Sequence, residues 1–165
     1  MRTYSLHCEM LVKRSLKETF AFFENPANLG KLTPPWLSFN IVTKDVPMGQ
    51  GAQFDYVIKW LGLPMKWRSL ISKYEPPFLF ADDQLIGPYK TWHHEHTFVQ
   101  TTDGVIVGDH LRYSLPMGLL GAIAQAVMVK RQLESVFRYR QSELAKIFPG
   151  DTEELVKPSI LRETA

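Results

Sequence analysis

The chain has 165 residues, 45% of them hydrophobic and 22% charged, with a net charge of +2. This length suits one domain with a substantial core. So small a charge, without a run of Lys and Arg, does not indicate a nucleic-acid partner. Cys8 is the only cysteine, which excludes a disulfide within the chain. The first residues lack the apolar core of a signal peptide, and the longest apolar stretch, residues 119–129, is too short to cross a bilayer. We therefore expect a cytoplasmic protein without a transmembrane segment.

The chain begins with a predicted strand followed by short helices. Apolar and polar residues alternate over residues 4–12, which is typical of a half-buried strand. Ser15 and Glu18 then form a capping box. This predicts a helix that ends near Pro26, because the residue before a proline disfavours helical backbone. A second short helical turn is expected to start at Asn28 and to end before the next pair of prolines.

Six further strands and one long helix follow. The alternating runs are residues 37–44, 52–61, 65–74, 78–85, 89–100 and 105–115, and turns that contain Gly or Pro separate them. Links this short favour an antiparallel meander. Residues 118–148 contain no proline, which predicts one helix of about 45 Å. The polar tail after Asp151 is expected to be flexible, or to pack loosely as a short turn.

This order of elements predicts an α+β fold. One curved sheet of seven antiparallel strands would wrap around the long C-terminal helix, with two short helices after the first strand. This is a helix-grip arrangement. The helix is too narrow to cover the sheet, so the two should enclose a space for a ligand. We expect a single ligand-binding domain over residues 1–150 and a C-terminal tail over residues 151–165.

Several short motifs accompany this order of elements. They are Phe22-Phe23, Asn28-Leu29, Leu32-Thr33-Pro34-Pro35, Trp67 with Ile71, Asp82 with Gln84, Gly87-Pro88-Tyr89, Trp92-x-His94-x-His96-x-Phe98, Asp109 with Tyr113, Leu115-Pro116, and Phe137 with Tyr139-Arg140. With them the chain resembles, over nearly its whole length, the START-like or SRPBCC superfamily, which includes the birch-pollen allergen. It more closely resembles the bacterial ligand-binding proteins of the polyketide cyclase/dehydrase type. The resemblance implies the helix-grip fold and a ligand such as a lipid, sterol, hormone or polyketide. No catalytic residue set is shared across the superfamily, so the resemblance implies none here.

Strand alternation assigns one face of each strand to the interior. Over residues 89–100, for example, His94 shares the inward face and His93 the solvent face. For residues 78–85 the two faces are similarly apolar, so the assignment stays open between the face of Phe80 and that of Ala81. The inward faces and the long helix together predict a ligand pocket. Its members are Phe54, Tyr56, Ile58, Trp60, Trp67, Ile71, Phe80, Asp82, Gln84, Trp92, His94, His96, Phe98, Asp109, Tyr113, Ile123, Val127 and Phe137.

Polar side chains are embedded among these apolar ones. They are His94, His96 and Asp109, with Asp82 and Gln84 if the face of Phe80 points inward, and the hydroxyls of Tyr56 and Tyr113. A polar group under a sheet costs free energy unless it is paired. The pattern leaves three roles open. The group is an internal hydrogen-bond cluster, a polar anchor for the head of an apolar ligand, or a catalytic pair in which His94 or His96 acts as acid–base and Asp109 orients it.

Residues 93–96 read His-His-Glu-His, a run that is rich in metal-ligand types. Because neighbours on a strand point to opposite faces, only His94 and His96 could share one ion. A third ligand would have to come from Asp109 or Asp82. The spacing of helical zinc hydrolase motifs is absent. We expect no metal and no other cofactor.

The long helix carries an apolar stripe at helical spacing, which predicts that it packs on the sheet. The stripe comprises Ile123, Ala126, Leu133, Phe137, Leu144 and Phe148. Lys130 falls within it, either with its stem packed and its amine in water or with its amine against an acidic ligand head. Residues 119–129 are apolar nearly all round. Their outer face therefore needs a cover from the C-terminal tail, a partner subunit or a membrane surface.

The sequence favours a binding module for a small, largely apolar molecule, such as a lipid, an isoprenoid, or an aromatic or polyketide-like compound. The alternative is an enzyme of the cyclase, dehydrase or hydrolase kind that uses His94, His96 and Asp109 in the same cavity. A third alternative is a structural domain whose large side chains fill the cavity. As partners we expect the small ligand and at most transient contact with a membrane, for a monomeric or homodimeric protein.

Overall fold

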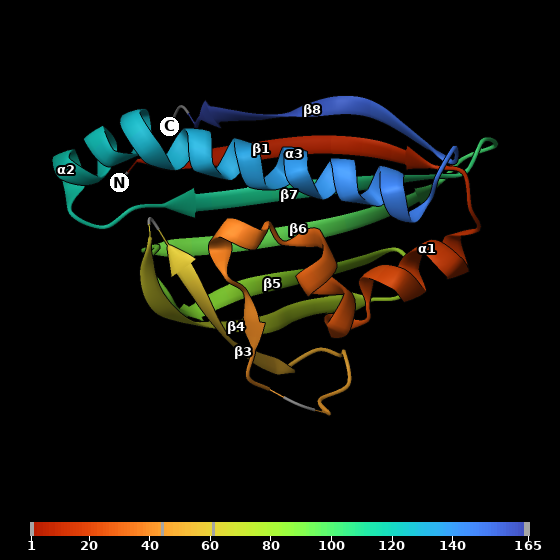
Figure 1. The fold of residues 1–165 in the computed structure, drawn as a ribbon, viewed down its shortest axis with the longest axis horizontal. Helices are drawn as coiled ribbons and strands as arrows, with labels where there is room; N and C mark the ends of the chain where they lie inside the picture. The colour runs from red at the N-terminus through yellow and green to blue at the C-terminus, as the bar shows by residue number, and fades with distance from the viewer. Residues whose placement is uncertain (1, 44, 61, 164–165) are drawn as a thin grey trace.

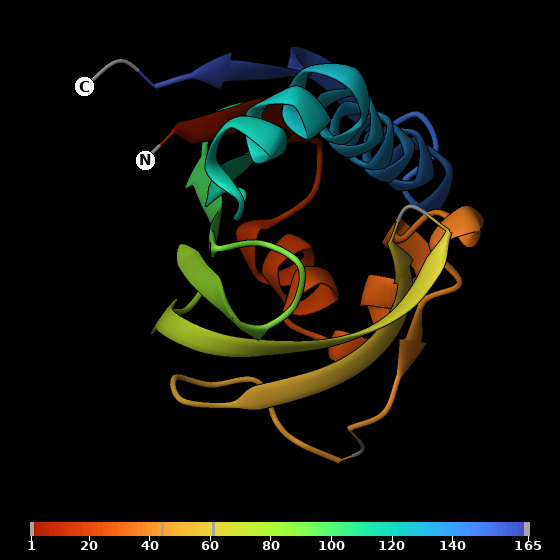
Figure 2. The same cartoon turned by 90° about the vertical axis from the view of Figure 1, so that its left-hand side faces the viewer.

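The computed structural model describes residues 2–43, 45–60 and 62–163, apart from the side chain of Trp60. Its central element is one antiparallel sheet with the strand order β2-β3-β4-β5-β6-β7-β1-β8. The strands are β1 (Thr3–Val12), β2 (Asn40–Ile41), β3 (Gln53–Trp60), β4 (Leu63–Glu75), β5 (Leu79–Ile86), β6 (Thr91–Gln100), β7 (Val105–Ser114) and β8 (Thr152–Arg162). The sheet curves around the long C-terminal helix, and the short helices lie inside the curve (Figure 1, Figure 2). The predicted α+β helix-grip fold is confirmed.

The alternating strands have the predicted faces. In β6, His94, His96 and Phe98 are buried, whereas His93 is exposed. In β5, Phe80 is buried and Asp82 faces the same way, but Ala81 is buried as well. Both faces of β5 are therefore partly covered, which is why their hydrophobicity did not separate them.

Short helices follow β1, as predicted, and close one end of the sheet. Helix α1 (Leu16–Phe23) starts at the predicted capping box, in which the backbone N–H of Glu18 donates to the Ser15 hydroxyl at 3.3 Å. Two 3₁₀ helices follow, η1 (Pro26–Leu32) and η2 (Pro35–Leu37). The strand predicted over residues 37–44 is reduced to the two-residue β2. The reason is local, because η2 ends at Ser38 in left-handed backbone with φ 45°, which no strand continues.

The long helix runs without interruption over residues 118–147, but it is not uniform. It consists of α2 (Gly118–Ala124), a π-helical stretch η3 (Gln125–Val129) and α3 (Lys130–Ile147). A π turn holds one more residue than an α turn, so it rotates the preceding residues around the axis. Gln125 consequently takes the inner position that uniform spacing gave to Ala126.

This rotation leaves the start of the helix with an apolar outer surface. The exposed side chains are Met117, Leu119, Leu120, Ile123, Val127 and Met128. A cover for them by a partner subunit or a membrane stays a prediction. No helix among the described residues is long and apolar enough to cross a membrane.

The segment after residue 150 forms a strand, which corrects the prediction of a flexible or loosely packed tail. Strand β8 pairs antiparallel with β1, so the sheet continues beyond the expected boundary. Pro158 and Ile160 turn inward and are buried. The physical reason is the edge of β1, whose backbone groups β8 pairs. A proline is tolerated in β8 because it is itself an edge strand.

Candidate functional site

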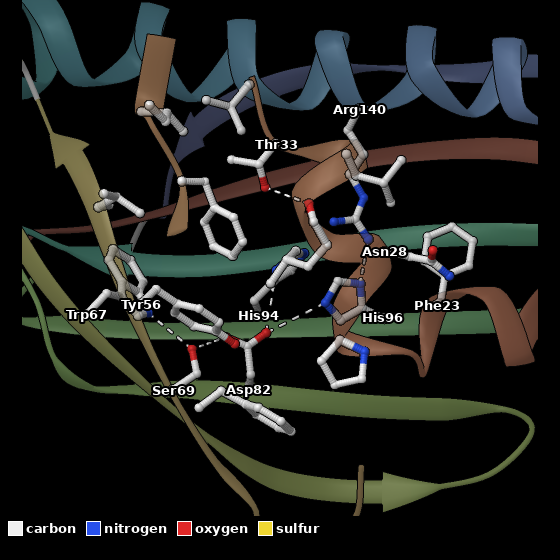
Figure 3. A pocket seen from close by; sticks show the side chains of 18 of the residues that line it. Phe23, Asn28, Thr33, Tyr56, Trp67, Ser69, Asp82, His94, His96 and Arg140 are labelled. Atoms are coloured by element: carbon white, nitrogen blue, oxygen red, sulfur yellow. Dashed lines mark hydrogen bonds and ion pairs between the residues drawn. The ribbon is translucent and has the colours of Figure 1, made fainter. Parts of the chain in front are cut away.

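A cavity of about 210 Å³ lies between the concave face of the sheet and α3. Strands β3 to β6 supply one wall, and α1, η1 and α3 supply the others. The sequence-predicted residues that line it are Phe54, Tyr56, Ile58, Trp67, Ile71, Phe80, Asp82, Trp92, His94, His96 and Phe137. Most of this lining is aromatic or aliphatic, and the polar members gather at one place (Figure 3).

Some predicted pocket residues point inward but do not reach the cavity. Gln84 is held by the backbone of Tyr89, donating to its carbonyl at 2.8 Å and accepting from its N–H at 3.2 Å. Phe98 packs edge-on against Phe20 and Phe23, with ring centroids 5.1 and 5.3 Å apart, in a second part of the core. Gln84 is therefore bound by the turn that follows its own strand, and Phe98 packs against α1, so neither side chain lines the cavity.

Three further predicted pocket residues do not line the cavity, and a fourth lies outside the described side chains. Tyr113 is buried, and its hydroxyl donates to Gln125 at 2.9 Å. Ile123 and Val127 are exposed because the π turn rotates them outward. The side chain of Trp60 lies outside the described part of the chain.

Several lining residues were not predicted. They are Phe22, Phe23, Pro26, Asn28, Leu29, Leu32, Thr33, Leu37, Phe39, Met48, Ser69, Tyr89, Gln132, Leu133, Val136 and Arg140. Many of them come from α1, η1 and the loops around β2, where no periodic pattern marks an inward face. Arg140 carried a usable signal, since it lies one helical turn from both Phe137 and Leu144 on the buried stripe.

The polar end of the cavity is built across three neighbouring strands. Asp82 on β5 lies opposite His94 on β6, and His96 on β6 lies opposite Asp109 on β7. The Asp109 Oδ1 atom is 3.0 Å from His94 Nε2 and 3.0 Å from His96 Nδ1. Asp109 thus lies behind both imidazoles and does not itself line the cavity. From α3, the Arg140 Nε atom approaches the other oxygen of Asp109 to 3.3 Å.

Burial and charge together set the protonation of this cluster. Burial raises the pKa of Asp109, but the Arg140 charge and both histidines outweigh it and hold that pKa well below its ordinary value. Burial likewise raises the pKa of Asp82, and the two imidazoles reverse the shift and lower it. Burial, assisted by repulsion from His96, lowers the pKa of His94 to about 4. Near neutral pH the carboxylates are therefore ionised and His94 is neutral.

A chain of hydrogen bonds continues from Asp82 along the cavity wall. The indole N–H of Trp67 donates to the Ser69 hydroxyl at 3.0 Å, and that hydroxyl donates to Asp82 at 3.2 Å (Figure 3). Tyr56 lies beside them, and burial, followed by the charge of Asp82, raises the pKa of its hydroxyl. These contacts fix one oxygen of Asp82 and leave the other directed at the imidazoles.

Three polar atoms of the lining are buried without a hydrogen-bond partner. One is the Nε atom of Arg140, which still has Asp109 as an ion-pair partner at 3.3 Å. The other two are the indole Nε1 of Trp92, a donor, and the amide Oε1 of Gln132, an acceptor. Buried polar groups in native proteins are nearly always paired, so an unpaired one needs an explanation. Both residues line the cavity, where a bound molecule could supply the missing partners.

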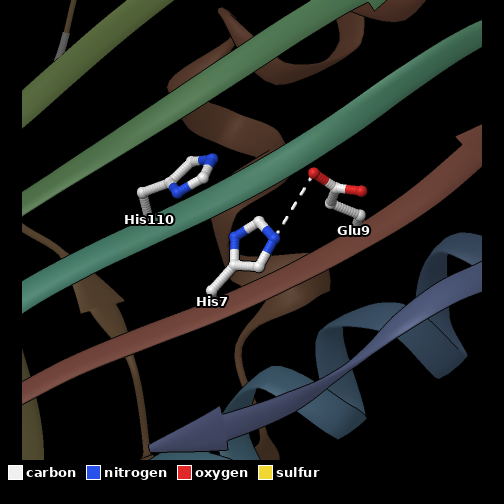
Figure 4. A group of neighbouring side chains, drawn as sticks. All are labelled: His7, Glu9 and His110. Atoms are coloured by element: carbon white, nitrogen blue, oxygen red, sulfur yellow. Dashed lines mark ion pairs between the residues drawn. The ribbon is translucent and has the colours of Figure 1, made fainter. Parts of the chain in front are cut away.

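A second cluster of histidines and a carboxylate lies on the opposite face of the sheet. His7 and Glu9 on β1 and His110 on β7 present side chains to the same outer surface (Figure 4). The two imidazole rings stack with centroids 4.3 Å apart, and His7 Nε2 is 3.3 Å from a Glu9 oxygen. Among the described residues, this trio and the trio of Asp82, His94 and His96 have the composition and spacing of metal ligands.

No family model and no curated protein matches the sequence. Solved structures do match. Protein CV1439 from Chromobacterium violaceum has a TM-score of 0.68 at 9% identity, over 89% of this chain and 98% of that one. Ginseng major latex-like protein 151 from Panax ginseng has a TM-score of 0.66 at 11% identity, over 90% and 99%. The di-domain ARO/CYC StfQ from the steffimycin biosynthetic pathway has a TM-score of 0.63 at 12% identity, over 88% and 52%.

At these identities the likeness concerns the fold. It extends over about nine-tenths of the chain. The chain therefore has the helix-grip fold of the START-like, or SRPBCC, proteins.

Proposed function

We propose that the protein binds a small, largely apolar molecule in the cavity between the sheet and α3. The observation that carries this proposal is a largely apolar cavity in which two polar atoms, Trp92 Nε1 and Gln132 Oε1, are buried without any partner. A structural domain filled by its own side chains would have no reason to leave such a space and two unpaired groups beside it. A ligand with one acceptor and one donor would satisfy both.

The size of the cavity narrows the ligand class. A dry cavity of about 150 Å³ in another protein holds benzene, and this one measures about 210 Å³. The space thus suits a compact aromatic or short isoprenoid compound better than a two-chain lipid. The rings of Trp67 and Trp92, which meet edge to face at 5.0 Å, give an aromatic ligand surfaces on which to pack.

A second candidate is an enzyme of the cyclase, dehydrase or hydrolase kind. One observation favours it: Asp109 contacts His94 at 3.0 Å, which is how a carboxylate orients a catalytic imidazole. The structurally similar StfQ is an ARO/CYC protein by its name. In that case His94 or His96 would act as acid–base on a molecule in the same cavity. We rank it second because catalysis needs, in addition, a reacting atom within reach of the imidazole.

Ligand binding can be tested with a substitution on α3 that fills the cavity. Val136 lines the cavity, whereas Val127, on the same helix, is 60% exposed. We expect Val136→Trp to weaken binding of a naphthalene-type fluorescent dye at least about tenfold, because the indole occupies the ligand's space. Val127→Trp should bind the dye as the parent protein does. Equal binding by both variants would refute the proposal, and native mass spectrometry of protein from its own host would identify a retained compound.

The cytoplasmic location and the monomeric or homodimeric state remain predictions from the sequence. Neither is needed for the binding experiment, which uses the purified chain.

A further inference from the structure

We propose that Asp82, His94 and His96 form a binding site for one divalent transition-metal ion at the polar end of the cavity. This revises the expectation of no metal, which the sequence favoured because only two of the histidines share a face and the spacing of helical zinc hydrolase motifs is absent. The site does not depend on the apolar ligand proposed above.

The first support is the distance between the three donor atoms. Asp82 Oδ2 is 3.7 Å from His94 Nδ1 and 3.6 Å from His96 Nε2, and the three atoms lie within 4.8 Å of one another. These separations exceed a normal hydrogen bond. Two donors that each lie about 2.1 Å from one tetrahedral ion are about 3.4 Å apart. The trio is therefore already close to the spacing that a shared ion requires.

The second support is the carboxylate behind the imidazoles. Asp109 contacts the other ring nitrogen of each histidine, His94 Nε2 and His96 Nδ1, at 3.0 Å. Metal-binding histidines commonly donate their second ring N–H to such a carboxylate, which directs the remaining lone pair at the ion. Here a single carboxylate serves both rings, and both lone pairs then point to the side on which Asp82 lies (Figure 3).

One contact competes with this arrangement. The guanidinium of Arg140 is 3.1 Å from His96 Nδ1 and, since it can only donate, it favours the tautomer in which that nitrogen is unprotonated. Metal binding requires the other tautomer, with the proton on Nδ1 and directed at Asp109. Arg140 keeps an ion-pair partner in either case, because its Nε atom is 3.3 Å from Asp109 Oδ2, although that contact lacks hydrogen-bond geometry.

The charges around Asp82 also favour a bound cation. Asp109 has the Arg140 guanidinium 3.3 Å away, whereas the ion-pair partners of Asp82 among the described residues are the imidazoles of His94 and His96 alone. A largely buried carboxylate is stabilised by a nearby cation, and a divalent ion between the imidazoles and Asp82 would supply one. Two nitrogens and one oxygen suit first-row ions such as Zn²⁺ and Co²⁺. With three protein ligands, the ion keeps an open position toward the cavity.

The experiment uses the outer trio as its matched control. Chelator-treated protein is titrated with Co²⁺, whose visible absorption reports its ligands, and with Zn²⁺ in competition with a chromogenic chelator. The variants are Asp82→Asn and His94→Gln inside the cavity, and His7→Gln and His110→Gln on the outer face. We expect one ion per chain in the parent protein and in both outer variants. Each inner variant should bind at least about tenfold more weakly and lose the Co²⁺ absorption.

Two outcomes would overturn the proposal. One is parent protein that binds less than one equivalent at micromolar Co²⁺ and Zn²⁺, and the other is binding that is lost in His7→Gln or His110→Gln and kept in Asp82→Asn. The fluorescent dye is titrated into the same metal-free proteins. Retained dye binding shows that Asp82→Asn has kept its cavity. It also separates failure of the metal site from failure of the ligand proposal, since dye binding without metal binding refutes the metal site alone.

Discussion

The two faces of the sheet carry the same residue types in different surroundings. Inside, Asp82 meets His94 and His96 across β5 and β6, whereas outside, His7 and Glu9 meet His110 across β1 and β7. In both trios, two residues are separated by one position on a strand and the third comes from the neighbouring strand. The local sequence therefore makes the two clusters look alike.

The two clusters differ in how deeply they are buried. The side chains of His94 and His96 are 8% and 6% exposed, and those of His7 and Glu9 are 39% and 32% exposed. Asp109 lies 3.0 Å from both inner histidines, whereas among the described residues no carboxylate forms an ion pair with both outer histidines. Only a buried cluster must satisfy its charges from within, so removal of one member should matter far more inside than outside.

The largest expected difference in stability is between substitutions of two carboxylates, Asp109 inside the sheet and Glu9 outside it. Asp109→Asn should lower the free energy of unfolding of the metal-free protein by about 3–5 kcal/mol, because it leaves the buried Arg140 without its ion partner. Glu9→Gln should cost less than about 1 kcal/mol, as for a solvent-screened pair. Urea denaturation of both variants measures the two values. Similar losses for both would show that the inner network has no special structural role.

A smaller difference is expected for the histidines themselves. His94→Ala removes a buried hydrogen bond to Asp109 and should cost about 1–3 kcal/mol in the metal-free protein, with the fold retained. His110→Ala, on the outer face, should cost less than about 1 kcal/mol. Thermal denaturation followed by circular dichroism compares the pair. If His110→Ala proved the more destabilising, the contrast between buried and exposed clusters would be wrong.

The smallest effect concerns the pH dependence of the outer cluster. Burial, followed by the charge of His7, lowers the pKa of His110 from 6.5, although Glu95, Glu9 and Asp109 oppose the shift. The unfolded chain then takes up a proton near pH 6.5 that folded His110 does not, so this residue destabilises the fold as the pH falls below 6.5. His110→Gln should therefore lose stability less steeply than the parent protein between pH 7 and pH 5.

Melting temperatures of both proteins, measured between pH 7 and pH 5, test the direction of this pH effect. Because His94 is present in both proteins, its own contribution cancels in the comparison. A steeper loss of stability in His110→Gln would mean that Glu9 and Glu95 hold His110 in its charged form.

Much of the inner site was predictable from the sequence. Alternation with a period of two residues is local, so it placed His94, His96 and Phe98 on the buried face of β6 and Asp109 on that of β7. The capping box at Ser15 also predicted the start of α1. These features need only neighbours in the chain, which is why they survive folding unchanged.

The tertiary structure decided the rest, because it depends on contacts between distant segments. The pairing of β5 with β6 brings Asp82 to the histidines, and the docking of α3 brings Arg140 to Asp109. The π turn turned Ile123 and Val127 outward, and the edge of β1 made residues 152–162 a strand. The sequence thus determined which residues share a face of each strand. The packing of strands and helix determined which of those residues meet, because burial and charge compensation exist only after the chain has closed around its cavity.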